Sequence, residues 1–183
     1  MRRQVSSFRA NNRAARAPQA RLIVTALIEQ DDSLLLVQLA HGRFAGFWLL
    51  PSATVEAEPI ERTLRCMVPE RTGYPVVDQQ LLSVLEEARV DAHTVRFVYR
   101  VQVGEKEGQP ADAEIATSRW FSREAARQVL EERDIVPTLG VMSLVRSWVE
   151  GIPPGPLELM VDDAQCPCGS GFRYPGCCGW DMR

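Results

Sequence analysis

Four cysteines near the C-terminus have the residue type and spacing of a metal site. Cys166 and Cys168 are separated by one residue, and Cys177 and Cys178 are adjacent further along the same segment. Four thiolates suffice for a closed tetrahedral zinc site. Gly169 and Gly171, which lie between the pairs, allow a tight chain reversal. Because so short a segment has no core of its own, zinc would supply its folding energy.

Free thiols or two disulfides are the alternatives for these cysteines. Four cysteines allow three pairings, and a bond between adjacent residues would be strained. A reducing cytoplasm disfavours disulfides further. Because a zinc ion with four protein ligands has no open position for substrate or water, the expected zinc is structural. We therefore interpret the tail as a docking element for a protein partner.

The cysteine segment resembles the SEC-C motif, a small zinc-binding element first seen at the tail of the bacterial preprotein translocase motor. The resemblance covers about fourteen residues and includes the Gly-Ser-Gly turn, Tyr174, the adjacent cysteines and Gly179. Phe172 and Pro175 stand where that motif usually carries lysines. The resemblance implies a structural zinc ion on all four cysteines.

A second set of candidate residues surrounds a predicted helix in the middle of the chain. Pro59 suits the first turn of this helix, and Gly73 suits its C-terminal end. Glu56 and Glu58 precede the helix, and Glu70 lies in its last turn. Carboxylates three or four residues apart on one helix face can share a hard cation through oxygen ligands.

Residues 49–76 resemble the Nudix box, a loop–helix–loop that holds magnesium against a diphosphate. The family pattern is G-x5-E-x7-R-E-U-x-E-E-x-G-U, with U an aliphatic residue. The context agrees over residues 21–150: a strand hairpin precedes the box, Phe-Trp-Leu-Leu-Pro opens it, and Arg-Trp-Phe-Ser at 119–122 opens a late helix. The resemblance implies the α/β fold of MutT-like proteins, a Nudix-type α/β/α sandwich with a mixed sheet.

When the family pattern is aligned with this segment, other residue types stand at most of the positions that bind magnesium. The Arg-Glu pair of the pattern falls on Cys66 and Met67, and the Glu-Glu pair falls on Glu70 and Arg71. A thioether is a poor ligand for magnesium, and a guanidinium repels the ion. We therefore expect Mg²⁺ or Mn²⁺ to bind weakly at best.

Four residues remain as candidates for the box site. Glu70 and Glu58 are the candidate catalytic carboxylates. Arg71 and Glu56 are the candidate substrate-binding residues, since a guanidinium can contact phosphate oxygens in place of a metal. The alternative for Arg71 is a solvated surface position. Pro69 removes a helix donor and costs about 3 kcal/mol in a regular helix interior, which would disturb the ligand geometry further.

Several other residues could have a chemical role, but a structural or surface role suits most of them better. Cys66 suits small apolar packing. The two histidines have no partner nucleophile in the sequence and suit loops or the surface. Aromatic residues before the box offer a stacking surface for a base, although Phe47 and Trp48 suit the core better. Carboxylates outside the box could add metal ligands, with no spacing to support them: Glu86, Glu87 and Glu114.

The remaining pattern predicts the elements that position these residues. Apolar runs at 21–29, 33–39 and 47–50 indicate strands, and 81–90 with 93–103 indicate an antiparallel pair. A strand at 118–121 leads to a helix over 123–133 capped by Ser122. A last helix begins at Pro137 and ends before Gly151. The predicted organisation is a Nudix-like domain at 21–150, a linker at 151–163 and the zinc motif at 164–183.

Charge is unevenly distributed along the 183 residues, whose formal net charge is -3. Residues 1–20 hold five arginines and no acid, which predicts a disordered basic arm. This arm could bind nucleic acid through phosphates, or be an ordinary disordered terminus. No apolar run suits a membrane span or a signal peptide. Because Lys106 is the sole lysine among 21 basic residues, the composition resembles that of a GC-rich bacterium, and we expect a cytoplasmic protein.

Two functional hypotheses follow. In the first, a Nudix-family protein has lost most magnesium ligands and is a weak or inactive hydrolase that binds a nucleotide or a protein, with the zinc tail docking to a partner. In the alternative, it is an active Nudix pyrophosphohydrolase that cleaves a nucleoside diphosphate linked to another moiety. The sequence shows no recognisable surface for oligomerisation.

Overall fold

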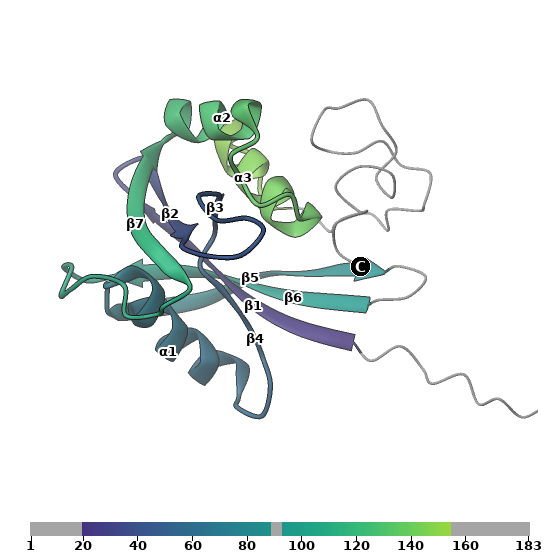
Figure 1. Ribbon diagram of the computed structural model, residues 1–183. Coiled ribbons are helices and arrows are strands. Elements are labelled where there is room, and N and C mark those ends of the chain that lie inside the picture. Colours follow the sequence, from purple (N-terminus) through teal and green to yellow (C-terminus); the bar gives the residue numbers. More distant parts are fainter. Residues whose placement is uncertain (1–19, 89–92, 155–183) are drawn as a thin grey trace, which may run out of the picture.

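The computed structural model describes residues 20–88 and 93–154 (Figure 1). The predicted basic arm, apart from Ala20, and the predicted zinc motif lie outside these residues, as does the linker from 155 onward. No helix within the described ranges has the length and apolar character needed to cross a membrane.

Seven strands of the described part form one mixed sheet. Its main path has the order β3-β2-β1-β6-β5, while β4 pairs with β1 and β7 pairs with β2. β1 and β6 are parallel, and the other pairs are antiparallel. The strands are β1 (Ala20–Gln30), β2 (Ser33–Leu39), β3 (Trp48–Leu49), β4 (Ser52–Thr54), β5 (Val76–Ala88), β6 (His93–Val103) and β7 (Ile115–Ser122).

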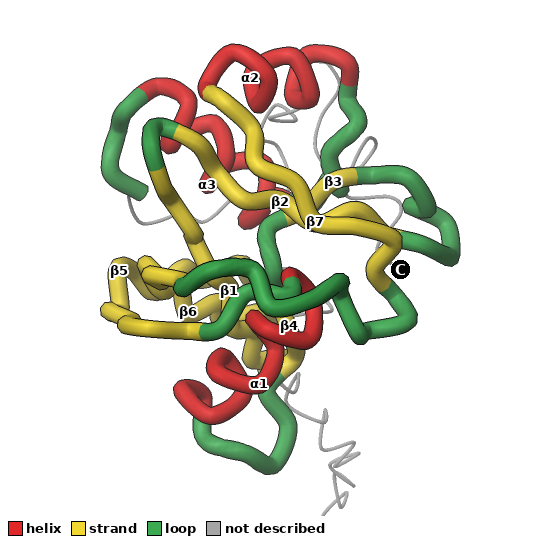
Figure 2. The backbone as a smooth tube through the Cα atoms, turned by 90° about the vertical axis from the view of Figure 1, so that its left-hand side faces the viewer, coloured by secondary structure: helices red, strands yellow, loops and turns green. Residues whose placement is uncertain are grey.

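Helices cover both faces of this sheet. α1 (Ile60–Thr72) lies on one face, whereas α2 (Arg123–Glu132) and α3 (Leu139–Glu150) lie on the other (Figures 1 and 2). Gly73 ends α1 in the left-handed conformation with φ 79°, as its position in the sequence predicted. The predicted mixed-sheet α/β/α sandwich is confirmed.

Side chains along the central strands point alternately to the two faces of the sheet, and each face carries its own apolar core. Leu64, Met67 and Val68 of α1 pack against one face of the sheet, together with alternate residues of β1 and β6. The intervening residues, such as Leu27 and Val98, pack with α2 and α3 on the opposite face. Both faces of β1 are therefore buried, which explains its nearly continuous apolar sequence.

The structure corrects several predicted boundaries. β4 was not predicted, because three residues give too short a pattern. β5 begins at Val76 rather than at 81, since shifts in its register break the alternation. α3 begins at Leu139 rather than at Pro137, because the Thr138 side chain accepts the N–H of Val141 and caps the helix there.

A buried polar cluster lies between the sheet and the start of α3. Arg96 is only 3% exposed and donates to Thr25 Oγ1 at 2.8 Å. Its Nε lies 3.7 Å from a carboxylate oxygen of Glu87, and within the described residues neither atom has a hydrogen-bond partner. Burial lowers the pKa of Arg96, and the Glu87 carboxylate opposes that shift. The sequence pattern of β6 did not predict that the charged side chain of Arg96 is buried.

Replacing Gly140 with alanine should destabilise the fold, because a Cβ there would overlap the Arg96 guanidinium and the Glu87 carboxylate. We expect Gly140→Ala to lower the free energy of unfolding by about 1–3 kcal/mol in urea denaturation. Gly108→Ala is the matched control, since a Cβ at Gly108 meets nothing within 4 Å. Equal stability of the two variants would contradict this packing.

Candidate functional site

The C-terminal turn of α1 carries the residues that the box register singled out. Met67 faces the sheet and is 4% exposed, whereas Glu70 is exposed. The helix continues through Pro69, whose carbonyl accepts the N–H of Gly73 at 2.9 Å. The family pattern has Arg-Glu and Glu-Glu at the four positions that Cys66, Met67, Glu70 and Arg71 occupy here. Glu70 is the only one of these four with an acidic side chain.

Arg71 joins this turn to the segment between β6 and β7. Its Nε lies 2.9 Å from Asp112 Oδ2, and a terminal nitrogen lies 3.0 Å from Glu114 Oε2. The Arg71 and Asp112 side chains are 16% and 21% exposed, so water screens this pair less than it would a surface pair, whereas the Glu114 side chain is 71% exposed. The guanidinium thus lies between two carboxylates contributed by residues far away in sequence.

Backbone hydrogen bonds hold the same segment, residues 104–114, against the helix end. The carbonyl of Glu70 accepts the N–H groups of Ala111 and Asp112 at 2.7 and 3.0 Å. Glu107 N–H donates to the carbonyl of Gly73 at 2.9 Å, and a Cβ at Gly73 would overlap the carbonyl of Gly108. Glycine at 73 is therefore required both for its left-handed backbone and for this close approach.

The two acidic residues that precede α1 are both exposed. Glu58 forms an exposed ion pair with Arg62 at 3.2 Å. Glu56 is exposed in the loop before the helix. Within the described ranges no three His, Cys, Asp or Glu side chains are grouped so that they could hold a metal ion. The roles predicted for Glu56, Glu58, Glu70 and Arg71 stay predictions.

Ser52, the first residue of β4, has a role in the fold. Its hydroxyl lies 2.9 Å from Thr25 Oγ1 and donates to the carbonyl of Leu50. Thr25 in turn accepts from Arg96, so Ser52 continues the buried polar cluster. No sequence pattern predicted this connection, because the three residues lie in different parts of the chain.

The other residues considered from the sequence fall mostly into structural roles. Trp48 and Phe121 form an edge-to-face pair with centroids 4.7 Å apart, and Trp48 packs against the core. Cys66 is exposed rather than packed. His93 lies 2.6 Å from Glu86, and His41 is exposed in a loop. Glu114, considered as an extra metal ligand, instead pairs with Arg71.

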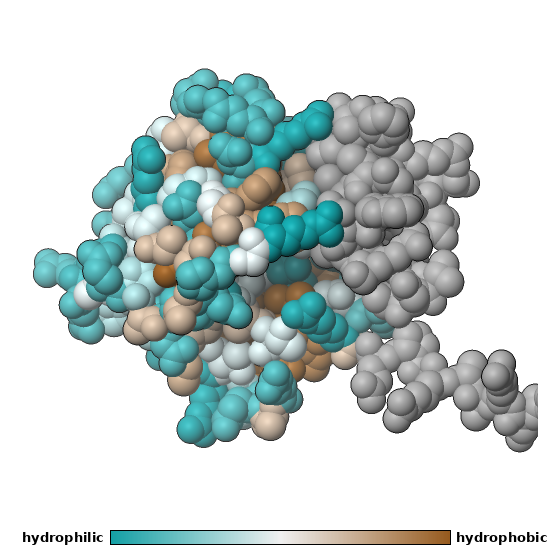
Figure 3. All heavy atoms as spheres, viewed as in Figure 1, coloured by the Kyte–Doolittle hydropathy of each residue, from teal (hydrophilic) through white to brown (hydrophobic). Residues whose placement is uncertain are grey.

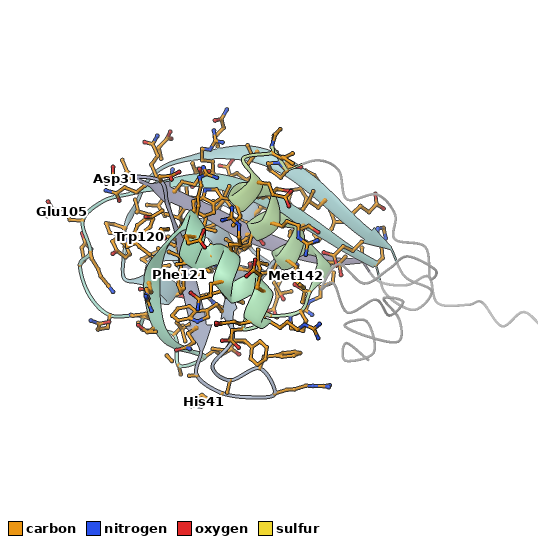
Figure 4. All side chains as sticks on the ribbon, turned by 90° about the horizontal axis from the view of Figure 1, so that it is seen from above. Asp31, His41, Glu105, Trp120, Phe121 and Met142 are labelled. Carbon is orange, nitrogen blue, oxygen red and sulfur yellow. The ribbon has the colours of Figure 1, made fainter. Side chains whose placement is uncertain are left out.

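A cavity of about 600 Å³ opens beside the end of α1, within the size range of ligand pockets. Tyr74 and Trp120 line it, with the indole N–H donating to the phenol oxygen at 2.9 Å. Lys106 also lines it, and its ammonium lies 5.5 Å from the centre of the Tyr74 ring. In Figure 4, Asp31, Glu105 and Trp120 gather at this end of the molecule. The cavity combines aromatic surface with charges of both signs.

Comparison with known proteins relates the described domain to solved structures. It superposes on a NUDIX hydrolase from Nitrosomonas europaea with a TM-score of 0.62 and 26% identity, over 76% of this chain and 94% of that one. A MutT NUDIX hydrolase from Burkholderia pseudomallei gives a TM-score of 0.54 at 23% identity, over 72% and 97% of the two chains. The domain has the Nudix fold.

Sequence comparison agrees with the Nudix fold. The chain is 29% identical over 119 residues to human 8-oxo-dGDP phosphatase NUDT18, covering 63% of this chain, and 26% identical to the mouse protein. It spans about a third (36%) of the length of these curated relatives. No family model matches the chain. The similarities in sequence and structure are thus to Nudix hydrolases.

A further Nudix-fold structure similar to this domain was solved with a ligand. The NUDIX domain of Shewanella oneidensis NrtR, complexed with ADP ribose, gives a TM-score of 0.51 at 19% identity, over 66% of this chain and 82% of that one. At this identity the similarity concerns the fold alone. The four cysteines of the predicted zinc motif lie outside the described residues, so that site stays a prediction.

Removing the Arg71 guanidinium should loosen the 104–114 segment. We expect Arg71→Gln to lower the free energy of unfolding by about 1–3 kcal/mol, because two carboxylates would lose a charged donor. Amide hydrogen exchange at 104–114 should accelerate as well. Arg65→Gln on an exposed position of α1 is the control and should leave both measurements nearly unchanged. Unaltered exchange in Arg71→Gln would show that the backbone contacts alone hold the segment.

Proposed function

We propose that this chain is a Nudix-fold nucleotide-binding protein with little or no metal-dependent diphosphate hydrolysis. The observation that carries the proposal is the placement of the Arg71 guanidinium between Asp112 and Glu114. A guanidinium keeps its positive charge at any physiological pH. It therefore neutralises the two carboxylates that could otherwise have shared a divalent ion with α1.

The donor set at the end of α1 fits magnesium poorly. Mg²⁺ prefers oxygen ligands in near-octahedral geometry. Met67 offers a thioether and is buried against the sheet, and Arg71 brings a competing positive charge. Glu70 alone provides a carboxylate from the helix face. A single carboxylate beside a fixed cation supports weak Mg²⁺ or Mn²⁺ binding at best.

The cavity beside Tyr74 supports binding of a nucleotide. Aromatic rings at Tyr74 and Trp120 offer surface for a base, and the Lys106 ammonium can attract phosphate. The ADP-ribose complex of a protein with the same fold makes ADP-ribose the first compound to test. In this proposal Arg71 holds residues 104–114, which include Lys106, against the end of α1. It can also contact phosphate itself.

The flanking segments complete the proposal. Cys166, Cys168, Cys177 and Cys178 bind a structural zinc ion, and this tail docks to a protein partner. The basic arm at residues 1–20 can add contacts with nucleic acid phosphates. A bacterial cytoplasmic setting agrees with the arginine-rich composition and with reduced cysteines.

The alternative is an active Nudix pyrophosphohydrolase, which the activity named for the human relative favours. Purified protein should be assayed with Mg²⁺ or Mn²⁺ against 8-oxo-dGDP, ADP-ribose and nucleoside triphosphates. We expect no turnover above that of Glu70→Gln, because the donor set holds the metal too weakly. Clear metal-dependent turnover that Glu70→Gln abolishes would establish the alternative instead.

The single lysine gives a direct probe of nucleotide binding. Reductive ¹³C-methylation labels Lys106, the only lysine in the chain, besides the terminal amine. ADP-ribose should shift the dimethyl-lysine resonance in a saturable manner, whereas ribose should not, because binding draws phosphate toward the ammonium. Tyr74→Leu should weaken this response by removing a ring of the cavity. A resonance unaffected by millimolar ADP-ribose would contradict nucleotide binding there.

The zinc content tests the cysteine cluster independently. Protein purified without chelator should contain about one zinc ion per chain, since four thiolates form a complete tetrahedral set. Replacing Cys177 and Cys178 with serine should remove the metal, whereas Cys66→Ser should not. Less than half an equivalent in the unsubstituted protein would contradict the structural zinc site.

A further inference from the structure

β5 forms the end of the main sheet path, with β6 on one side. It spans 13 residues, from Val76 to Ala88. Within the described residues no strand pairs with its other edge. The free edge of a long strand carries backbone donors and acceptors that can pair with another extended segment. β5 is therefore a surface on which an added strand could bind.

Exposed apolar side chains concentrate on this strand. Among the described residues, four large hydrophobic side chains are exposed, and three of them lie on β5: Val77 (63%), Leu81 (48%) and Val84 (45%). The face drawn in Figure 3 instead shows apolar residues only in small areas between polar ones. Leu81 and Val84 pair with Tyr99 and Phe97, so they lie on the α1 side of the sheet, near its edge.

The fourth exposed side chain marks the path along which the chain leaves the domain. Ile152 is 55% exposed and follows directly after α3. Together with Pro153 and Pro154 it lines a cavity of about 270 Å³ that also includes Leu82 of β5. The last described residues therefore share a cavity with Leu82 on the α3 side of the sheet, and the chain continues from there.

The sequence that follows suits an added strand. Residues 155–161 read Gly-Pro-Leu-Glu-Leu-Met-Val, so Leu157, Leu159 and Val161 alternate with other residues. Such alternation is typical of a strand with one apolar face. Seven extended residues span roughly 23 Å, which is enough to follow β5 from Leu82 to either end. Attachment at Pro154 also gives this segment a high effective concentration at the strand.

We propose that residues 156–161 bind along the free edge of β5 and cover Leu81 and Val84 with their apolar side chains. A second copy of β5 fits this edge less well. All charged side chains of β5 are acidic, namely Asp78, Glu86 and Glu87, so an antiparallel copy would bring like charges together. The bound segment would also place the cysteine cluster, which begins at Cys166, next to the sheet.

Hydrogen exchange of the full chain tests this assignment. In Leu157→Asp/Leu159→Asp, amides of 76–88 should exchange about tenfold faster than in the unsubstituted protein, with the other strands unchanged. Glu158→Gln, in the same segment, is the matched control and should preserve protection. Conversely, Val84→Asp should accelerate exchange at 156–161. Thermal unfolding of each variant shows that the domain itself remains folded.

Two results would overturn the proposal. One is slow amide hydrogen exchange of β5 that persists in Leu157→Asp/Leu159→Asp. This result would show that another segment, such as the N-terminal arm, covers the strand. The other is a molar mass, measured by light scattering, that rises to that of a dimer as the protein concentration increases and stays that of a monomer in Leu81→Asp. This result would show that a second copy of the chain binds the free edge of β5. We expect a monomer across the tested concentrations.

Discussion

The guanidinium of Arg71 lies where the C-terminal turn of α1 meets the segment between β6 and β7. It binds Asp112 and Glu114, and the carbonyl of Glu70 accepts two N–H groups from the same segment. Ion pairs and backbone hydrogen bonds therefore both hold the end of α1 to a segment that is distant in the sequence. In our proposal, this internal cation is what separates the chain from an enzyme that needs a divalent metal at the same place.

The position of this turn depends on the sheet beneath it. α1 is fixed by Leu64, Met67 and Val68 on one face, while α3 covers the other face above the Arg96 cluster. Because Met67 packs inward, a glutamate there would have to leave the core before it could bind a metal. In our proposal, the methionine at this position both packs the helix against the sheet and leaves the helix without a carboxylate there.

Local signals in the sequence predicted much of the fold. Gly73 ends α1, and Ser122 caps α2 by accepting the N–H of Ala125. The partners of Arg71 could not be predicted in the same way, because Asp112 and Glu114 lie about 40 residues away and no spacing rule connects them. Arg96 was missed for a related reason: its burial depends on α3, which lies far along the chain.

The most direct test of this account measures Mn²⁺ affinity when the Arg71 charge is reversed. Arg71→Glu leaves Asp112 and Glu114 without their cation and adds a carboxylate to α1, beside Glu70. Calorimetric titration should show at least about tenfold tighter Mn²⁺ binding than in the unsubstituted protein, with no such gain in Arg65→Glu, which changes the net charge equally. Equal affinity in Arg71→Glu and the unsubstituted protein would contradict the claim that Arg71 occupies the place of the metal.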